Sequence, residues 1–228
     1  MMANKARKRS TRGFTLVEVL ISIFIFSIII TTVFASHRSV FVSAPLVESN
    51  IDLYEMSATC LGRMAQDLRS IYITQPPAYQ KPEFDADPDP HRVAGAAEGS
   101  GSTPRLRFAS LAHLPLEQSS REGVAQIVYY ETPVGEDTFR LRRADSLYPF
   151  PAFEVDERDP VLCEMVKKLE ITFLDQEGNE YEYWDSESDE FDYATPVAIN
   201  FMIELVKDGS ASVFETRVSL PVVRESLE

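Results

Sequence analysis

The stretch that decides the fold is residues 12–36, which read RGFTLVEVLISIFIFSIIITTVFAS. After Gly13 the run stays apolar for about 23 residues, or ~35 Å as a helix, which is enough to cross a hydrocarbon core of about 30 Å. Residues 1–13 form a basic leader without acids, with cations at Lys5, Arg7, Lys8, Arg9 and Arg12. The stretch therefore predicts a single transmembrane helix over residues 14–36, with its N-terminus in the cytoplasm and the rest of the chain outside.

Three interpretations of this apolar run are open. A secretory signal peptide cleaved near Ala35 would usually have a shorter run, of about 7–15 residues, and no carboxylate. A plain signal anchor explains the length but not Glu18, because a carboxylate near the centre of a membrane helix costs about 2.5–3.5 kcal/mol. A helix that is clipped at Gly13 and then packs against copies or relatives of itself accounts for both features.

The sequence GFTLVE at residues 13–18 resembles the prepilin-type cleavage motif of type IV pilins and type II secretion pseudopilins. The resemblance implies that a prepilin peptidase cuts between Gly13 and Phe14 and methylates the new amine of Phe14. It also implies that Glu18 pairs with the amine of a neighbouring subunit, which neutralises two charges that are each unfavourable in lipid. The alternative for Glu18 is a carboxylate that reaches to the lipid headgroups.

The charge balance limits the possible partners. The chain has 22 Lys and Arg against 36 Asp and Glu, a net charge of −14. Loss of the leader would leave 17 basic residues and a net charge near −19. We expect no nucleic-acid partner, because binding to phosphates requires a basic surface.

The chain has two cysteines, Cys60 and Cys163, which lie far apart in the sequence. Outside the cytoplasm they could form one disulfide. Two buried free thiols are the alternative, and both possibilities stay open at this level. The spacing of the two residues is not that of a zinc site.

Residues 37–75 predict a continuation of the helix beyond the membrane. Apolar residues recur at seven-residue spacing and form one stripe: Tyr54, Leu61 and Leu68, with Leu53, Met64 and Ile71 beside them. We expect this stripe to pack under the chain's own sheet. Pro45 should bend or break the helix, and Gly62 should admit a close neighbour.

Residues 76–228 predict a β-rich domain. The part up to residue 104 is rich in proline and glycine and predicts a loop. Short runs of β-type composition follow at residues 105–109, 126–131, 138–143, 166–174, 180–184, 196–206 and 212–220. Gly135 and the pair Asp208-Gly209 predict hairpin turns. The expected fold class is α+β, with one long N-terminal helix packed on an antiparallel sheet.

Several short blocks, taken in order, are similar to those of the J-type minor pseudopilins of type II secretion systems: RMAQDLR (63–69), IVYY (127–130), LRR (141–143), VKKLEITFLD (166–175) and PVAI (196–199). The resemblance implies a type IV pilin-like fold and a structural role in the tip complex of a pseudopilus, which helps to export proteins across the outer membrane. The implied partners are the minor pseudopilins of the I and K types, the major pseudopilin and the prepilin peptidase. The implied location is the bacterial inner membrane, with the C-terminal domain in the periplasm.

Two other functions are alternatives to this interpretation. The chain could be a minor pilin of a type IV pilus, or an uncleaved membrane-anchored binding module of the envelope. An enzyme is not expected, because the three histidines are scattered at His37, His91 and His113 and no nucleophile or phosphate-loop motif is present. We also expect no cofactor.

Two further sets of residues are candidates for binding. Val40, Phe41, Leu46 and Val47 precede the expected sheet, and we expect these apolar side chains to bind a partner pseudopilin. Asp85, Asp87 and Asp89 alternate as at the start of an EF-hand loop, which makes them weak calcium candidates. Pro90 and Ala96 stand where that loop needs glycine and glutamate, so a solvated acidic loop is favoured.

Overall fold

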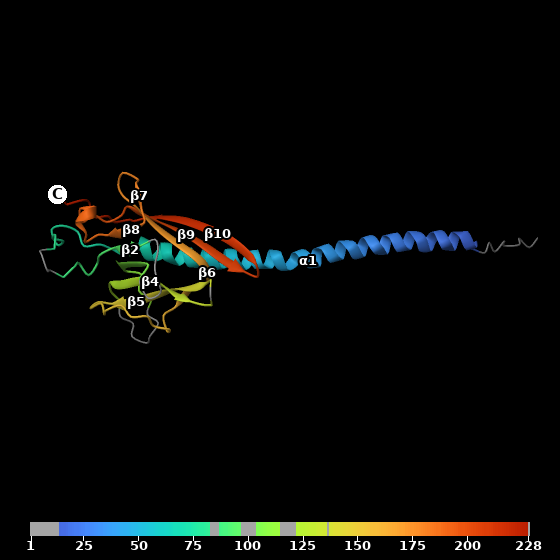
Figure 1. The fold of residues 1–228 in the computed structure, drawn as a ribbon, viewed down its shortest axis with the longest axis horizontal. Helices are drawn as coiled ribbons and strands as arrows, with labels where there is room; N and C mark the ends of the chain where they lie inside the picture. The colour runs from blue at the N-terminus through green and yellow to red at the C-terminus, as the bar shows by residue number, and fades with distance from the viewer. Residues whose placement is uncertain (1–13, 83–86, 97–103, 115–121, 136, 228) are drawn as a thin grey trace, which may run out of the picture. The chain divides into compact units, whose positions relative to one another are not determined.

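The computed structural model describes residues 14–82, 87–96, 104–114, 122–135 and 137–227, without the side chains of residues 36–50. The chain divides into two compact units, Met1–Glu48 and Ser49–Glu228. One helix, α1, runs from Leu16 to Arg69, and it is the blue to blue-green coil in Figure 1. An apolar N-terminal helix followed by a large antiparallel sheet makes the fold α+β and pilin-like, as predicted.

The helix continues without a break through Pro45, so of the two effects expected there the break does not occur and the bend stays a prediction. A proline removes one backbone hydrogen bond from a helix, and the turns on either side can keep theirs. The helix ends at Arg69, and Ile71 begins the first strand.

The second unit contains ten strands among the residues that the structure describes. They are β1 Ile71–Tyr72, β2 Ala94–Ala96, β3 Leu106–Ser110, β4 Ala125–Pro133, β5 Phe139–Leu147, β6 Val161–Leu174, β7 Glu180–Tyr181, β8 Tyr183–Asp185, β9 Ala198–Lys207 and β10 Ser210–Ser219. The main path of the sheet is β10-β9-β6-β5-β4-β3-β2-β8, with β1 paired to β3 and β7 paired to β6. Every pairing is antiparallel.

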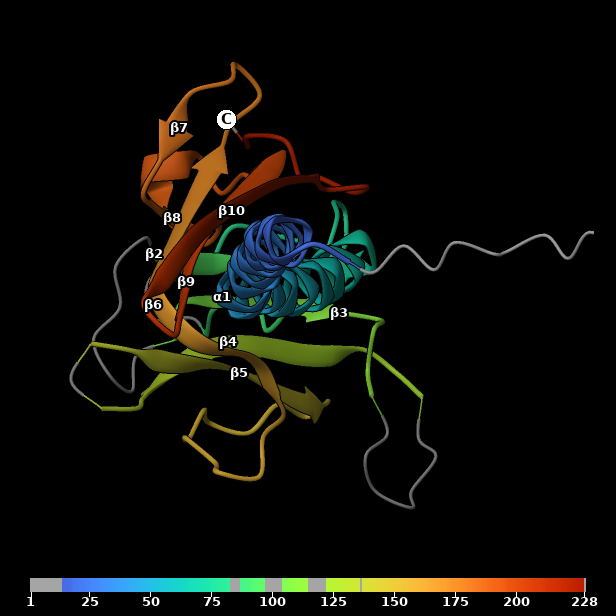
Figure 2. The same cartoon turned by 90° about the vertical axis from the view of Figure 1, so that its right-hand side faces the viewer.

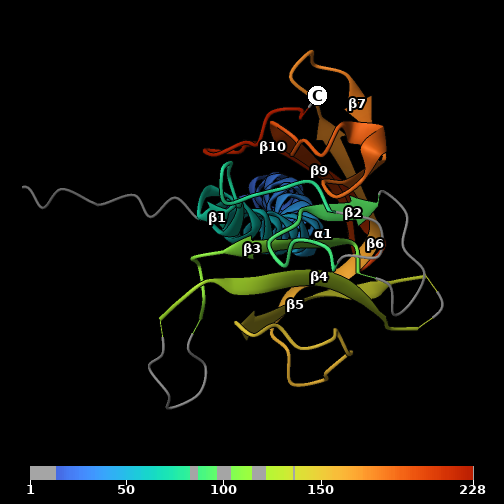
Figure 3. The ribbon, with the colours of Figure 1, turned by 90° about the vertical axis from the view of Figure 1, so that its left-hand side faces the viewer.

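The sheet curls around the C-terminal part of α1, as the two end-on views show (Figures 2 and 3). Alternate residues of the central strands point at the helix, as the two-residue period of a strand requires. Phe108, Ile127 and Phe201 are fully buried in this way and form one core with Leu53, Met64 and Leu68 of α1. The predicted helical stripe therefore packs under the chain's own sheet.

One residue of the predicted stripe is placed differently. Tyr54 is 66% exposed and lies at the rim of the core, where its ring centroid is 6.3 Å from that of Phe214 on β10. The close neighbour expected at Gly62 is also absent, because a Cβ built there would meet no atom of the described chain within 4 Å. Seven-residue spacing drifts around a straight helix of 3.6 residues per turn, so a row that is buried at Leu61 and Leu68 can leave the buried face at Tyr54.

Both predicted hairpin turns are confirmed. Asp208 and Gly209 have positive φ angles of 50° and 79°, as a two-residue turn of type I′ requires, and they join β9 to β10 with Lys207 opposite Ser210. Gly135 has a φ of 79° in the connection between β4 and β5. The two turns fix the register of the longest hairpins in the sheet.

The short strands at one end of the sheet correct three predictions. The run predicted as a single strand over residues 180–184 forms β7 and β8, which pair with β6 and β2 respectively. Strand β2 lies inside the segment predicted as a loop, and β1 was not predicted. In β2, Gly95 brings the backbone so close to β3 that an added Cβ would lie 2.7 Å from the Arg105 carbonyl oxygen.

Candidate functional site

The N-terminal end of α1 carries the predicted processing residues, although Gly13 lies outside the described residues. Phe14 is 81% exposed. The backbone N–H of Thr15 donates to a carboxylate oxygen of Glu18 at 3.3 Å, and the N–H of Glu18 donates to the Thr15 hydroxyl at 3.3 Å. This reciprocal pair is a capping box, which satisfies two backbone donors that a helix start leaves free.

The capping box gives Glu18 a partner within its own chain. The carboxylate also lies in the first turn, where the positive end of the helix dipole stabilises negative charge. Sequence reasoning assigned Glu18 only to a neighbouring subunit or to the headgroups and did not consider Thr15. The Thr-x-x-Glu spacing of the capping box was readable in the sequence.

The rest of the first unit is suited to lipid. Leu16–Ala35 is long and apolar enough to cross a membrane, which is compatible with a single membrane anchor. The hydroxyl groups in it donate to helix carbonyl oxygens three or four residues earlier, at 2.7–2.9 Å: Ser22, Ser27, Thr31 and Thr32. Because these donors are satisfied inside the helix, lipid contact leaves none of them unpaired.

Helix α1 contains the residues predicted to bind a partner, Val40, Phe41, Leu46 and Val47. The structure does not describe their side chains. The first described apolar side chains after them divide between two environments. Ile51 and Tyr54 are exposed, whereas Leu53 is fully buried. Ile51 and Tyr54 are the large apolar side chains of the described helix surface in the second unit that its own sheet leaves exposed.

The two cysteines meet between α1 and β6, and both are buried free thiols. The sequence left a disulfide and two buried free thiols open, and the pairing of Cys60 with Cys163 stays a prediction. The hydrogen bond to the Cys163 thiol and burial raise the pKa of the Cys60 thiol. A raised pKa disfavours the reactive thiolate.

The weak calcium candidates do not form a site in the described part of the chain. Asp85 lies outside it, and Asp87 lines an open cavity of about 350 Å³. Asp89 points inward and pairs with Arg224 at 3.3 Å, so its carboxylate is already engaged. The described residues contain no group of three or more His, Cys, Asp or Glu that could hold a metal ion.

Arg224 is a buried cation that sequence reasoning missed. Its Nη2 donates to the Ser186 carbonyl at 2.6 Å and to Glu187 at 2.9 Å, and its guanidinium lies 3.4 Å from the centre of the Tyr79 ring. The residue thereby holds the C-terminal segment against two distant loops. Glu187, in the acidic stretch at residues 185–192, is buried here as the partner of this arginine.

A second missed cluster attaches α1 to β4 and β5. Asp67 and Arg143 have fully buried side chains, and Arg143 Nε donates to Asp67 Oδ2 at 2.8 Å. The Tyr129 hydroxyl donates to the same oxygen at 2.8 Å, and Arg63 pairs with the other oxygen at 2.7 Å. Both residues stand in blocks that the sequence singled out, but only the folded chain brings them together.

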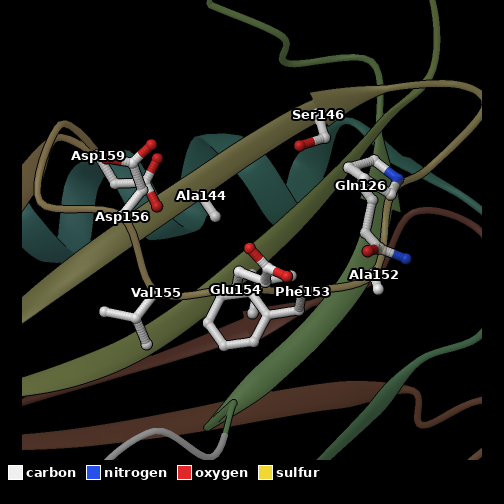
Figure 4. Close-up of a pocket in the computed structure, with 11 residues that line it drawn as sticks. Gln126, Ala144, Ser146, Ala152, Phe153, Glu154, Val155, Asp156 and Asp159 are labelled. Carbon is white, nitrogen blue, oxygen red and sulfur yellow. The ribbon is translucent and has the colours of Figure 1, made fainter.

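The face of the sheet turned away from α1 carries a cavity of about 290 Å³ beneath the segment that follows β5. Figure 4 shows Asp156 and Asp159 side by side at one end, with Gln126 and Ser146 at the other. Burial raises the pKa of Asp159, whose carboxylate accepts a hydrogen bond from the Tyr130 hydroxyl at 2.8 Å. No nucleophile and base are paired among its described lining residues.

Comparison with known proteins agrees with the N-terminal site. Residues 8–34 match the prokaryotic N-terminal methylation motif. No curated protein matches the chain closely enough to count as a relative. The motif, the apolar helix and the curled antiparallel sheet together support a type IV pilin-like protein, the class that includes the pseudopilins. Proteins that carry this motif are structural rather than enzymatic.

Proposed function

We propose that the chain is a minor pseudopilin of a type II secretion system and a part of the tip complex of its pseudopilus. The observation that carries the proposal is the methylation motif at the start of an apolar helix, followed by a pilin-like sheet domain. Residues 14–36 anchor the chain in the bacterial inner membrane, and the sheet domain lies in the periplasm. The J-type order of sequence blocks favours this role over a minor pilin of a type IV pilus.

In this mechanism a prepilin peptidase cuts between Gly13 and Phe14 and methylates the new amine. The capping box holds the Glu18 carboxylate at the end of the helix, near the position of that amine. The amine of a neighbouring subunit pairs with Glu18, because an ion pair shields both charges from lipid. The partner pseudopilins of the I and K types contact the apolar residues Val40, Phe41, Leu46 and Val47. The major pseudopilin assembles with this complex of minor pseudopilins.

The role of Glu18 is tested by separating insertion from assembly. Glu18→Ala should still insert, because it makes the helix more apolar, but it should lose cross-links to other pseudopilins. Thr15→Val is the matched control, since it removes the hydroxyl of the capping box and leaves the charge. Cross-linking in the native host should therefore fall strongly for Glu18→Ala and little for Thr15→Val. Equal yields in Glu18→Ala and the wild type would contradict the pairing.

The identity of the cross-linked partners tests the function itself. Photo-cross-linkers at Val40 and Leu46 should capture pseudopilins encoded with a secretion system. Capture of the major pilin of a type IV pilus would favour the minor-pilin alternative. Capture of no pilin-like protein, together with an intact leader, would favour an uncleaved envelope binding module.

A further inference from the structure

Arg107 on β3 is a half-buried cation that the described chain leaves without a partner. Its Nε is buried with no hydrogen-bond acceptor, and no hydrogen bond or ion pair within the described residues involves its other nitrogens. Nε is the one nitrogen of Arg107 that is both buried and without an acceptor among the described residues, and a buried N–H donor without an acceptor is unfavourable. Arg107 therefore lacks acceptors that a ligand could supply.

The buried arginines of the same domain show what the fold normally provides. Arg142 donates to the Asp159 carbonyl at 2.5 Å, Arg143 donates to Asp67 at 2.8 Å, and Arg224 donates to the Ser186 carbonyl at 2.6 Å. Each of these guanidinium groups is matched by a carboxylate or carbonyl oxygen from a distant part of the chain. Arg107 is the exception to this pattern among the buried and half-buried arginines that the structure describes.

The position of Arg107 in the sheet explains why no acceptor is present. Its neighbours Leu106 and Phe108 face the core, so Arg107 stands on the face turned away from α1. The residues paired with it on the adjacent strands are Ala94 on β2 and Val128 on β4. Both are small and apolar, so neither offers an oxygen to the guanidinium or covers it fully.

A second arginine adds positive charge at the same place. Burial and the neighbouring charge of Arg92 lower the pKa of Arg107, and the opposing effect of Asp185 does not cancel them. Asp185 is also the only carboxylate in the described chain within ion-pair distance of Arg92, at 3.6 Å. Two guanidinium groups against one carboxylate leave a net positive site on a chain whose overall charge is −14.

We propose that Arg107, with Arg92 beside it, binds an oxyanion, and that a carboxylate is its natural ligand. The planar guanidinium donates two parallel N–H bonds to the two oxygens of a carboxylate, which a single point charge cannot do. The ligand carboxylate supplies the acceptors that Ala94 and Val128 lack. A free anion and a side chain of another polypeptide share this chemistry. The inference does not depend on the proposed function.

The test uses the full chain in uncharged detergent micelles, labelled with 15N, and follows the arginine Nε–H resonances. The probes are N-acetyl-glutamate amide, inorganic phosphate and, as the neutral control, N-acetyl-glutamine amide. We expect a saturable shift of the Arg107 resonance with the two anions and none with the neutral amide. Arg107→Gln should abolish binding, and Arg92→Gln should weaken it several-fold. Arg140→Gln, at a partly exposed arginine on β5 that is paired with Glu164, should leave it unchanged.

Each outcome decides something about the site. Tighter binding of the glutamate derivative supports a polypeptide carboxylate as the ligand, and tighter binding of phosphate supports the site but assigns it to a free anion. If Arg107→Gln does not fold, the Arg107 resonance in the wild type and in Arg92→Gln still decides the question. The absence of a saturable shift with either anion would overturn the proposal, and so would an equal response in Arg92→Gln and the wild type.

Discussion

Asp67 is the centre of the polar cluster that joins α1 to the sheet. It is fully buried and holds the equally buried Arg143, while it also accepts from Arg63 and Tyr129. A buried ion pair adds little to the free energy of unfolding compared with an apolar pair of the same volume. Removal of one partner is nevertheless destabilising, because it leaves the other charge buried without a counter-charge. The cluster therefore specifies where the helix docks.

Asp67→Asn should be strongly destabilising for this reason. Loss of the carboxylate charge leaves Arg143 buried with only Asp145 as a charged partner, and we expect a loss of about 3–5 kcal/mol in the free energy of unfolding. Chemical denaturation in micelles measures it. Lys167→Gln is the control, because it breaks an exposed pair with Glu204 and should change stability by less than about 1 kcal/mol. Similar losses in the two variants would contradict the assignment.

Because of Asp89, we expect the stability of the domain to depend on pH in the acid range. Burial alone would raise the pKa of Asp89, but hydrogen bonds from His91 and Thr74 outweigh it and hold the pKa below its usual value of 3.8. A depressed pKa contributes stability that is present above the unfolded pKa and is lost as the pH falls through the folded one. That contribution should begin to fall near the usual pKa of 3.8 and be lost as the pH drops further, through the lower folded pKa.

The melting temperature measured between about pH 6 and pH 3 tests this dependence. The wild type should lose more stability on acidification than Asp89→Asn, which has no carboxylate left to protonate. Asp137→Asn, at an exposed residue, should follow the wild type. Parallel curves for the wild type and Asp89→Asn would show that the Asp89 carboxylate does not carry this pH dependence.

At the scale of elements, two glycines have opposite roles. A Cβ at Gly95 would lie 2.7 Å from the Arg105 carbonyl oxygen and 2.8 Å from Phe173 Cζ, so Gly95→Ala should force β2 away from β3. We expect a loss of about 1–3 kcal/mol, as for other overpacked sites. Gly62→Ala adds a methyl group in open space inside α1 and should gain about 0.5–1 kcal/mol. Denaturant midpoints that move in the same direction would contradict this pair of predictions.

The elements that the sequence predicted well carry their own local signals. Strands β9 and β10 alternate cleanly and are joined by Asp208-Gly209, and the apolar run of α1 is decided by length and composition alone. Strands β1, β2 and β8 have two or three residues each, and they are strands only because distant segments pair with them. No local pattern distinguishes such short segments from a loop.

The candidate sites likewise divide into those with a local sequence signal and those that form only when distant residues meet in the fold. The Phe14–Glu18 motif and its capping box lie within a few residues of each other and can be read from spacing. The Asp67–Arg143 and Arg224–Glu187 pairs join residues 76 and 37 positions apart, so their partners become visible only in the fold. The unpartnered Arg107 is the same kind of feature, because its significance rests on what the neighbouring strands do not provide.

At the scale of the whole molecule, the chain combines an anchor that carries a methylation motif with a sheet domain that has its own core. The apolar first unit has no apolar core in its described residues, and every described side chain of Leu16–Ala35 is exposed. Such a surface is stable only in lipid or against other apolar helices. In the proposed function, processing at Gly13 converts this anchor from a precursor into a subunit that can assemble.

The mass of the N-terminal peptide, measured on protein purified from its native host, tests whether the anchor is processed. We expect a mature chain that begins at Phe14 with an N-methyl group. A variant with a bulky residue in place of Gly13 should accumulate as the unprocessed precursor, because the peptidase must approach the backbone closely. Mature protein that keeps the leader, or that begins at Ser36, would show that this processing does not occur.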